Sequence, residues 1–288
     1  ATSNEIGLPI SIVEKDYYVT MILKELSKRN NNVVFKGGTS LSKCFNIINR
    51  FSEDIDITFN VQLGEARRQN IKNKLMSEIS KDLDLKITNI NEVKSKAKFN
   101  CYNFKYEPIY KKIDKELYPG IKLETVMSTY AFPTVEKEVD SYVRKFLVKE
   151  NKDIIKEYGL DKFKMKVQSL ERTFIDKIFA LCDYYLQGKS ERYSRHLYDI
   201  YKLNKHVMKN SEFKKLVKAV REHRKGVSSA ISAKEGYNIK SIVHEFCDNS
   251  FYKKDYKDIT GYFINDYVSY DDTIKCICKI VDEGYFDE

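Results

Sequence analysis

The stretch Lys36-Gly37-Gly38-Thr39-Ser40-Leu41, followed by Arg50-Phe51-Ser52-Glu53-Asp54-Ile55-Asp56-Ile57, decides how this chain folds. It comes directly after Val33-Val34-Phe35, an apolar run that predicts a short buried strand. Glycines at the end of such a strand let the backbone approach a phosphate closely. The alternating residues from Asp54 to Phe59 predict a second strand, on which Asp54 and Asp56 point to one face about 6.6 Å apart. A phosphate-binding loop beside paired carboxylates suits the transfer of a phosphoryl or nucleotidyl group.

Asp54 and Asp56 are predicted metal ligands, because two neighbouring carboxylates repel each other unless a divalent cation lies between them. A solvated strand end would also tolerate two acids, but it does not explain the glycine pair before them. The segment Ile121–Thr125 offers a third carboxylate from a neighbouring strand, Glu124; an exposed acid on an edge strand is the alternative. Together the three would hold two Mg²⁺ ions, one on the nucleotide phosphates and one that lowers the pKa of an attacking hydroxyl.

The nucleotide phosphates are expected at a run of four residues: Gly37, Gly38, Thr39 and Ser40. Thr39 and Ser40 start a helix predicted to continue to Ile48, where free N–H groups, hydroxyls and the helix dipole favour a triphosphate. An ordinary helix N-cap accounts for the same residue types. Arg50 is expected to add positive charge to the phosphate pocket, with a solvated surface arginine as the alternative.

The first half of the chain mixes helical and strand patterns. The predicted helices are Ser11–Arg29, opened by a capping box, Thr39–Ile48 and Arg67–Lys81; the predicted strands are Val33–Phe35, Asp54–Phe59, Leu85–Ile90, Ala97–Tyr106 and Gly120–Tyr130. Beyond about Val135 only helical spacing continues, over Gln168–Leu186, Arg195–Met208, Glu212–His223, Ile239–Phe246 and Asp271–Val281. We therefore predict an α+β protein, with a mixed β-sheet and flanking helices in residues 1–135 and an all-helical domain in residues 136–288.

The composition is that of a globular chain. Over 288 residues, 42% are hydrophobic and 32% are charged, which supports both a buried core and a solvated surface. No apolar run reaches the length of a membrane span, and residues 1–7 lack a signal-peptide pattern, so we expect a cytoplasmic protein without a membrane partner. The six cysteines and four histidines form no zinc-binding pattern, which argues against a zinc hydrolase. The net charge of +9 favours a polyanionic partner.

The order of these motifs carries a resemblance. Gly-Gly-Thr followed by Asp-x-Asp resembles the polymerase-β-type nucleotidyltransferase superfamily. The longer run from Lys36 to Asp56 is similar to the AbiEii/AbiGii family of bacterial toxins. Two further stretches agree: Glu14-Lys15-Asp16-Tyr17-Tyr18, and Glu171-Arg172-Thr173-Phe174-Ile175-Asp176-Lys177 followed by Ser194-Arg195-His196-Leu197-Tyr198-Asp199. The resemblance spans residues 11 to 205, and the residues beyond about 210 match nothing in the pattern.

The resemblance implies a nucleotidyltransferase-type sheet and a helical half that supplies a lysine and an aspartate facing the nucleotide. By motif position these are Lys177 and Asp199, with Arg195 as a further phosphate contact. Lys177 lies among apolar residues, so its burial requires an anionic partner or a ligand phosphate, unless it reaches solvent at the helix edge. The alternative for Asp199 is an ion pair with Arg195 one turn away. His196 departs from the family pattern, in which many members carry an acid.

Members of the family are toxins of type IV toxin–antitoxin or abortive-infection systems, and several transfer nucleotides to the 3′ end of tRNA. The resemblance therefore implies a Mg²⁺-dependent nucleotidyltransferase with an NTP substrate, a tRNA or other RNA acceptor and a cognate antitoxin that often forms no stable complex. Nine basic residues against two acids between Lys202 and Lys225 suit an RNA backbone, or equally a solvated face. A small-molecule or protein acceptor is one alternative. A non-catalytic nucleotide- or RNA-binding module is another, although three carboxylates argue against it.

Overall fold

The computed structural model describes residues 1–50, 52, 54–109 and 120–287. Phe51 and Glu53, which belong to the motif before Asp54, lie outside the described residues. The chain forms two compact units. We call Ala1–Phe45 with Ser52–Gln168 the sheet unit, and Asn46–Phe51 with Ser169–Glu288 the helical unit. The chain therefore enters the helical unit twice, briefly before Ser52 and finally at Ser169.

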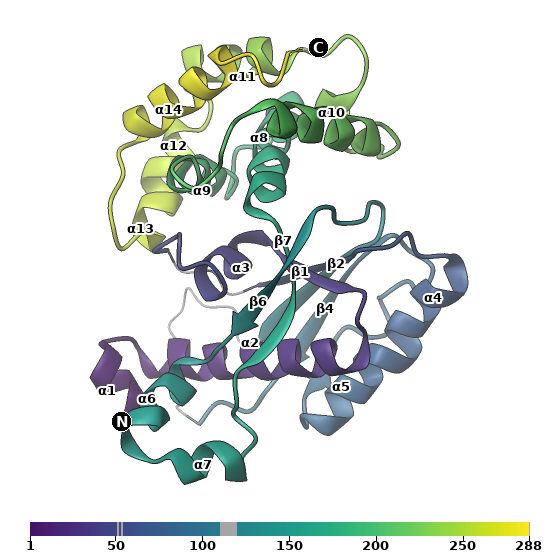
Figure 1. Ribbon diagram of the computed structural model, residues 1–288, viewed down its shortest axis with the longest axis vertical. Coiled ribbons are helices and arrows are strands. Elements are labelled where there is room, and N and C mark those ends of the chain that lie inside the picture. The colour runs from purple at the N-terminus through teal and green to yellow at the C-terminus, as the bar shows by residue number, and fades with distance from the viewer. Residues whose placement is uncertain (51, 53, 110–119, 288) are drawn as a thin grey trace. The chain divides into compact units, whose positions relative to one another are not determined.

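The sheet unit holds a seven-stranded sheet in the order β3-β4-β5-β2-β1-β7-β6 (Figure 1). Its strands are β1 (Val33–Lys36), β2 (Ile55–Phe59), β3 (Lys86–Ile87), β4 (Phe99–Lys105), β5 (Ile121–Val126), β6 (Thr134–Val139) and β7 (Phe163–Gln168). The pairs β1–β7 and β2–β5 are parallel, and the other neighbours are antiparallel. The sheet is therefore mixed, and the α+β class predicted from the sequence is confirmed.

Two of the strands lie beyond the boundary expected near residue 135. β6 and β7 pair along their whole lengths, so the prediction that strands end near Val135 is wrong. β6 is an edge strand, and Glu136 and Glu138 on it are exposed. Edge strands often carry charged residues, which keep other strands from pairing with them, and here these charges obscured the strand pattern. The helical unit accordingly resumes at Ser169, not at residue 136.

Helices surround the sheet within its own unit. They are α1 (Thr2–Ile6), α2 (Ile10–Arg29), α3 (Gly37–Lys43), α4 (Glu65–Asn70), the π-helix η1 (Ile71–Met76), α5 (Ser77–Asp82), α6 (Tyr142–Glu150) and α7 (Lys152–Glu157). The first long helix was predicted correctly, but it is entered through Pro9, so Ser11 lies in its first turn rather than at the cap. α3 is shorter than the helix predicted over Thr39–Ile48.

The core of the sheet unit determines which strand residues remain available for a site. α2 packs against β5, β7 and α5, and its buried face includes Ile22 and Leu23. These side chains form one cluster with Ile55 and Ile57 of β2. Full burial of such a side chain stabilises a fold by roughly 1.5–3 kcal/mol. Because successive strand residues point to opposite faces, Asp56 lies on the face away from this core.

The helical unit contains α8 (Leu170–Leu186), α9 (Arg195–Leu203), α10 (Ser211–Lys225), η2 (Ile231–Ala233), α11 (Ile239–Asp248), α12 (Lys253–Asp255), η3 (Tyr256–Thr260), α13 (Gly261–Phe263) and α14 (Tyr270–Asp282). The five helices predicted beyond residue 167 correspond to α8, α9, α10, α11 and α14. Aromatic side chains fill much of this core; Phe213, for example, contacts Phe174 and Phe286 edge-on.

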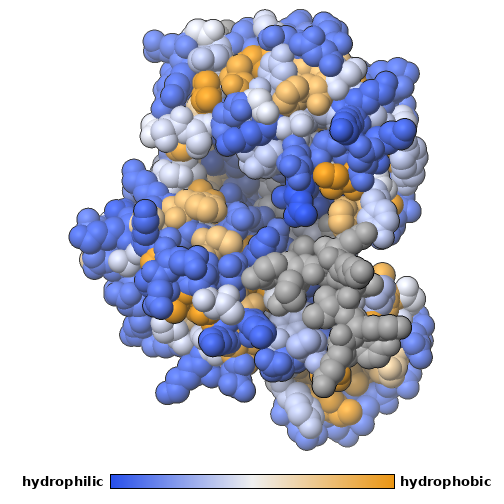
Figure 2. All heavy atoms as spheres, turned by 180° about the vertical axis from the view of Figure 1, so that it is seen from behind, coloured by the Kyte–Doolittle hydropathy of each residue, from blue (hydrophilic) through white to orange (hydrophobic). Residues whose placement is uncertain are grey.

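The surface is mainly polar on the face shown in Figure 2, where hydrophobic residues appear in small scattered groups. Large exposed apolar side chains such as Met208 and Tyr267 lie singly along the sequence. In the described part of the chain, no helix has the length and apolar character needed to cross a membrane.

Candidate active site

Four residues from adjacent strands form a row across the sheet. Lys36 of β1 is the register partner of Asp56 in β2, and Asp56 is the partner of Glu124 in β5. Glu124 in turn faces Cys101 of β4. All four residues are partly exposed. Because neighbouring strands lie about 4.8 Å apart, the structure brings Asp56 and Glu124 side by side.

Gly37 lies directly against this row. It is the first residue of α3 and has a φ of +78°, in the left-handed region that glycine adopts without steric penalty. A Cβ built at this position would lie 2.0 Å from Asp56 Oδ2 and 2.8 Å from its Cγ. The Asp56 carboxylate thus occupies the space that any other side chain at position 37 would need. Glycine is required here by both its backbone angle and its neighbour.

Thr39 and Ser40 are buried, and their hydroxyls bond within the loop. Thr39 Oγ1 donates to the backbone oxygen of Asp54 at 2.5 Å and lies 2.9 Å from Ser52 Oγ. Ser40 Oγ donates to the backbone oxygen of Gly37 at 2.8 Å. These bonds fix the backbone at Gly37 and at Asp54. The first N–H groups of α3 have no acceptor within the helix, so they, rather than the hydroxyls, are the donors available to a phosphate.

A brace within the sheet unit holds α3 in place. Asp16 of α2 forms an ion pair with Lys43, the last residue of α3. The other carboxylate oxygen of Asp16 accepts from the backbone N–H of Tyr142 at 2.8 Å. Lys43 also donates to the backbone oxygen of Asp140 at 3.2 Å. The motif Glu14–Tyr18 therefore contributes to packing around the glycine loop rather than to the row of carboxylates.

The three predicted metal ligands fit Mg²⁺ in chemistry, since carboxylate oxygens suit a small hard cation. Strand register places two of them, Asp56 and Glu124, side by side. The charges of all three act on one neighbour: the pKa of the Cys101 thiol is raised to about 11, first by burial and then by Glu124, Asp54 and Asp56. Within the described residues, however, no three acidic, histidine or cysteine side chains stand together as a ready metal site. The carboxylates of Asp54, Asp56 and Glu124 therefore do not form a three-ligand group in this structure.

A second set of predicted residues meets inside the helical unit. Asp199 of α9 is completely buried. Arg50 donates to both of its carboxylate oxygens, from Nε and Nη2, at 2.7 Å each. Lys177 of α8 donates to Oδ2 at 2.7 Å. Bidentate, charge-assisted bonds of this kind are among the strongest in proteins. Asp199 thus pairs with Arg50 and Lys177, and not with Arg195 as the alternative had it.

The electrostatics of this cluster follow from its burial. Burial alone would raise the pKa of Asp199, but Arg50 and Lys177 outweigh it and lower that pKa far below its usual range. The pKa of Lys177 is lowered, chiefly by burial and against the attraction of Asp199. Asp199 is therefore ionised throughout the physiological range. Two cations around one anion leave a net positive charge, which favours a phosphate group.

His196 lies beside the cluster, with Nδ1 3.3 Å from Lys177 Nζ. Its pKa is lowered well below the ordinary value, by burial first and then by Lys177 and Arg195, so the ring is neutral at neutral pH. The ring is parallel to that of Tyr184, which stacks on Tyr193. Within the described residues the Arg195 guanidinium makes no hydrogen bond or ion pair, which leaves it available to an anionic ligand.

The segment that carries Arg50 is anchored by its own contacts to the helical unit. Asn49 donates its backbone N–H to the Tyr198 hydroxyl at 3.2 Å and accepts from the backbone N–H of Asn265 at 2.9 Å. Arg50 itself forms an isolated antiparallel bridge with Ile264. These bonds explain how an arginine only four residues before Asp54 in the sequence comes to belong to the other unit.

The family model described as "Nucleotidyl transferase AbiEii toxin, Type IV TA system" matches residues 22–265 of the chain. The chain belongs to the AbiEii family. It is thus a nucleotidyltransferase toxin of the type IV toxin–antitoxin class. Among solved structures it is similar to MenT4, a nucleotidyltransferase toxin from Mycobacterium tuberculosis, with 14% identity and a TM-score of 0.48, over 96% of this chain and 84% of that one. No curated protein matches this chain.

Several residues of the AbiEii site region were not among those predicted. Cys101 carries no motif signal, because its place beside Glu124 comes from strand register. Ser52 lies within the motif before Asp54, but its hydrogen-bond contact with Thr39 is a tertiary contact that the motif does not indicate. His196 had a signal in its departure from the acid that many members carry there. The partnership of Arg50 with Asp199 joins residues 149 positions apart, a pairing that a single sequence does not reveal.

More than half of the basic residues between Lys202 and Lys225 form ion pairs within the chain. Five of the nine basic residues in this stretch have acidic partners: Lys202 with Asp266, Lys209 with Glu283, Lys215 with Glu212, Arg224 with Asp176 and Asp183, and Lys225 with Glu222. A backbone-binding surface needs cations that are free to replace counterions. The stretch therefore lends weaker support to RNA binding than its composition indicated.

Proposed function

We propose that this AbiEii toxin is a Mg²⁺-dependent enzyme that transfers a nucleoside monophosphate from an NTP to the 3′ end of tRNA, and so blocks translation. The observation that carries the proposal is the register of Asp56 with Glu124 beside the close approach of Gly37. Family membership supports nucleotidyl transfer. The choice of tRNA rests on the motif resemblance, and so does the proposal that a cognate antitoxin acts in the same cytoplasm without a stable complex.

In the proposed reaction the acceptor hydroxyl oxygen bonds to the α-phosphorus of the NTP. The bond from that phosphorus to the oxygen of the β-phosphate breaks, and pyrophosphate leaves with its electron pair. The hydroxyl proton passes to a carboxylate oxygen of Glu124. Asp54, Asp56 and Glu124 would hold Mg²⁺, which supplies charge neutralisation and a lower pKa for the attacking hydroxyl.

The proposed phosphate contacts come from backbone and cationic groups. The turn at Gly37 and Gly38 and the N–H groups of Thr39 and Ser40 would take phosphate oxygens, because a helix start offers free donors. Lys177, Arg50 and Arg195 are proposed to offset the charge on the phosphates, with Asp199 a nucleotide-site residue that fixes the orientation of Arg50 and Lys177.

The deciding experiment incubates the full chain with MgCl₂, each radiolabelled NTP in turn and total bacterial RNA. We expect label in the tRNA band, and its loss on chelation of the metal or in Asp56→Asn. Glu136→Gln is the matched control, since Glu136 is an exposed carboxylate on the edge strand of the same sheet. This control should retain the activity of the unmodified chain.

Each other result would redirect the proposal. Label that moves only to protein or to a small molecule would reject RNA as acceptor while leaving the transferase chemistry intact. Full activity in the presence of chelator would reject the metal. NTP binding without any transfer would indicate a binding module on an inherited fold.

A further inference from the structure

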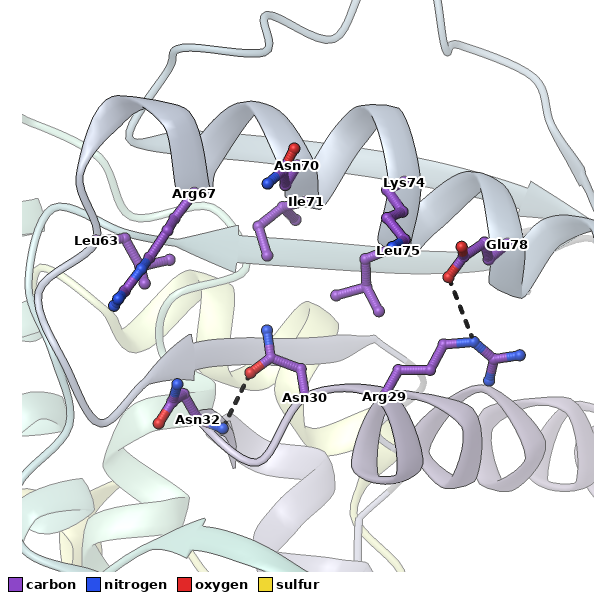
Figure 3. A pocket seen from close by; sticks show the side chains of 10 residues that line it. All are labelled: Arg29, Asn30, Asn32, Leu63, Arg67, Asn70, Ile71, Lys74, Leu75 and Glu78. Atoms are coloured by element: carbon purple, nitrogen blue, oxygen red, sulfur yellow. Dashed lines mark hydrogen bonds and ion pairs between the residues drawn. The ribbon is translucent and has the colours of Figure 1, made fainter.

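The sheet unit contains a pocket of about 320 Å³ at the end of β1 opposite Gly37 (Figure 3). One wall is the helical segment α4–η1–α5, and the other is the turn from α2 into β1, with Asn30 and Asn32. Asn32 and Gly37 are separated by the length of β1, about 16 Å for five residues of extended strand. The pocket is thus distinct from the row of carboxylates, and its volume is near the lower end of that of small-molecule sites.

The floor of the pocket is apolar. It is made by Leu63, Ile71 and Leu75, each of which is less than 8% exposed. Figure 3 shows Ile71 and Leu75 pointing from the helical wall into the space between the walls. Branched aliphatic side chains at such a floor suit a flat apolar surface such as the face of a heterocyclic ring.

The rim is cationic. Arg67 and Lys74 are exposed, and neither forms an ion pair with the described residues. Figure 3 shows Arg67 reaching from the helical wall toward the opposite wall. Arg29, by contrast, is neutralised by Glu25 and Asp82 and lies 3.8 Å from Glu78 across the pocket. Two cations without acidic partners beside an apolar floor point to a ligand with one anionic group and one flat apolar body.

Side-chain amides complete the polar lining. The Asn30 side-chain oxygen accepts from the backbone N–H of Asn32 at 3.0 Å. This bond turns the Asn30 amide nitrogen toward the helical wall, as Figure 3 shows. Amides that both donate and accept hydrogen bonds match the edge of a nucleobase, whereas a fatty acyl chain would leave them unsatisfied.

The helical wall has an irregularity at the pocket itself. Ile71, Lys74 and Leu75 lie in the π-helix η1, which interrupts an otherwise α-helical segment. π-Helical turns are rare and occur frequently at functional sites. The irregular turn thus coincides with the residues that form the floor and the rim.

We propose that this pocket binds one nucleotide unit, with its phosphate on Arg67 and Lys74 and its base on the floor of Leu63, Ile71 and Leu75. The unit is either a free nucleotide or one nucleotide of an RNA chain, since both present the same phosphate, sugar and base. Arginine binds phosphate through paired N–H groups, and the salt dependence of binding should reflect the two cations. The proposal does not depend on the transfer reaction, because Arg67 and Lys74 have no place in that site.

The test measures binding of the four nucleoside monophosphates, inorganic phosphate and a single-stranded 12-nucleotide RNA to the full chain by calorimetry. The test variant is Arg67→Ala/Lys74→Ala. The matched control is Lys81→Ala/Lys86→Ala, which removes two exposed lysines of the same unit that do not line the pocket. We expect at least about 10-fold weaker binding in the test variant only. Circular dichroism should show that all variants remain folded.

The arms of the experiment also identify the source of the nucleotide. Binding of RNA at least about 10-fold tighter than any monophosphate, and sensitive to the same two cations, assigns the pocket to an RNA chain. Equal or tighter binding of a monophosphate assigns it to a free nucleotide. The proposal would be overturned if inorganic phosphate bound as tightly as the monophosphates. It would also be overturned if the test variant bound the probes as tightly as the unmodified chain, or if no probe bound.

Discussion

The carboxylates of the sheet unit and the charged cluster of the helical unit differ in how their charges are arranged. Asp56 and Glu124 put like charges on adjacent strands of a partly exposed face. Asp199 instead lies completely buried between Arg50 and Lys177. Neighbouring like charges cost stability unless a ligand compensates for them, whereas a buried anion with cationic partners becomes costly to remove. The exposed pair is suited to binding a cationic ligand. The buried cluster is expected to contribute to the stability of the fold as well.

The largest effect is expected at the carboxylates. Asp56→Asn or Asp54→Asn should lower the rate of nucleotide transfer by at least about 10³-fold, because a lost metal ligand removes several kcal/mol of charge stabilisation. The urea midpoint should change little, since both aspartates lie on a partly exposed face. Rates come from label transfer and midpoints from far-UV circular dichroism. A variant that loses stability along with activity would show that these carboxylates support the fold as Asp199 is expected to do.

Asp199→Ala should affect the fold as well as the activity. Removal of this carboxylate leaves Arg50 and Lys177 buried without their anion, which should lower the free energy of unfolding by about 3–5 kcal/mol. Asp266→Ala is the matched control, since Asp266 also accepts from a lysine and a tyrosine but is 38% exposed. Its loss should cost about 1 kcal/mol or less. Unfolding by urea is followed by circular dichroism, because the chain has no tryptophan. Equal losses of unfolding free energy in the two variants would contradict the proposed stabilising role of the buried Asp199 carboxylate.

The same contrast explains what the sequence could predict. Gly37, Asp54 and Asp56 lie within 20 residues of one another, and glycine turns and alternating acids have local physical causes, so the loop and strand were found. Glu124 could be proposed because its own strand alternates, and strand register then placed it beside Asp56. The partners of Asp199 could not be assigned, since Arg195, the arginine one helical turn before it, is not among them.

The missed strands have a similar explanation. β7 reads Phe-Lys-Met-Lys-Val-Gln, a clear alternation whose signal was available. β6 reads Thr-Val-Glu-Lys-Glu-Val, with charged residues in its middle and Val135 exposed. As an edge strand it has a neighbouring strand on one side only. Fewer of its side chains are therefore buried, and its sequence need not alternate between apolar and polar residues. Hydrophobic periodicity therefore locates central elements better than edges.

Gly37→Ala should give an intermediate effect. A Cβ there requires a left-handed backbone and displaces the Asp56 carboxylate, so we expect transfer to fall by about 10–100-fold, equivalent to about 1.4–2.8 kcal/mol of barrier. Gly159→Ala is the control for backbone strain alone, because Gly159 has a φ of +58° but nothing within 4 Å of its added Cβ. It should cost roughly 1–2 kcal/mol of stability and leave the rate unchanged. Equal transfer rates in the two variants would show that the position of the Asp56 carboxylate does not depend on glycine at position 37.

The smallest effect is expected at His196 and depends on pH. Its pKa is lowered in the folded chain, so the unfolded chain binds its proton first as the pH falls below about 6.5. The stability contributed by the neutral ring is therefore complete above that pH and declines below it, by at most about 1.4 kcal/mol per pH unit. His196→Gln should flatten this decline between roughly pH 6.5 and 5, while glutamine can still accept from Lys177.

His223 also has a lowered pKa, but a less strongly shifted one, so His223→Gln should flatten the curve less. Parallel curves for the unmodified chain and His196→Gln, measured by urea unfolding at each pH, would show that the ring next to Lys177 is not held neutral by the cluster.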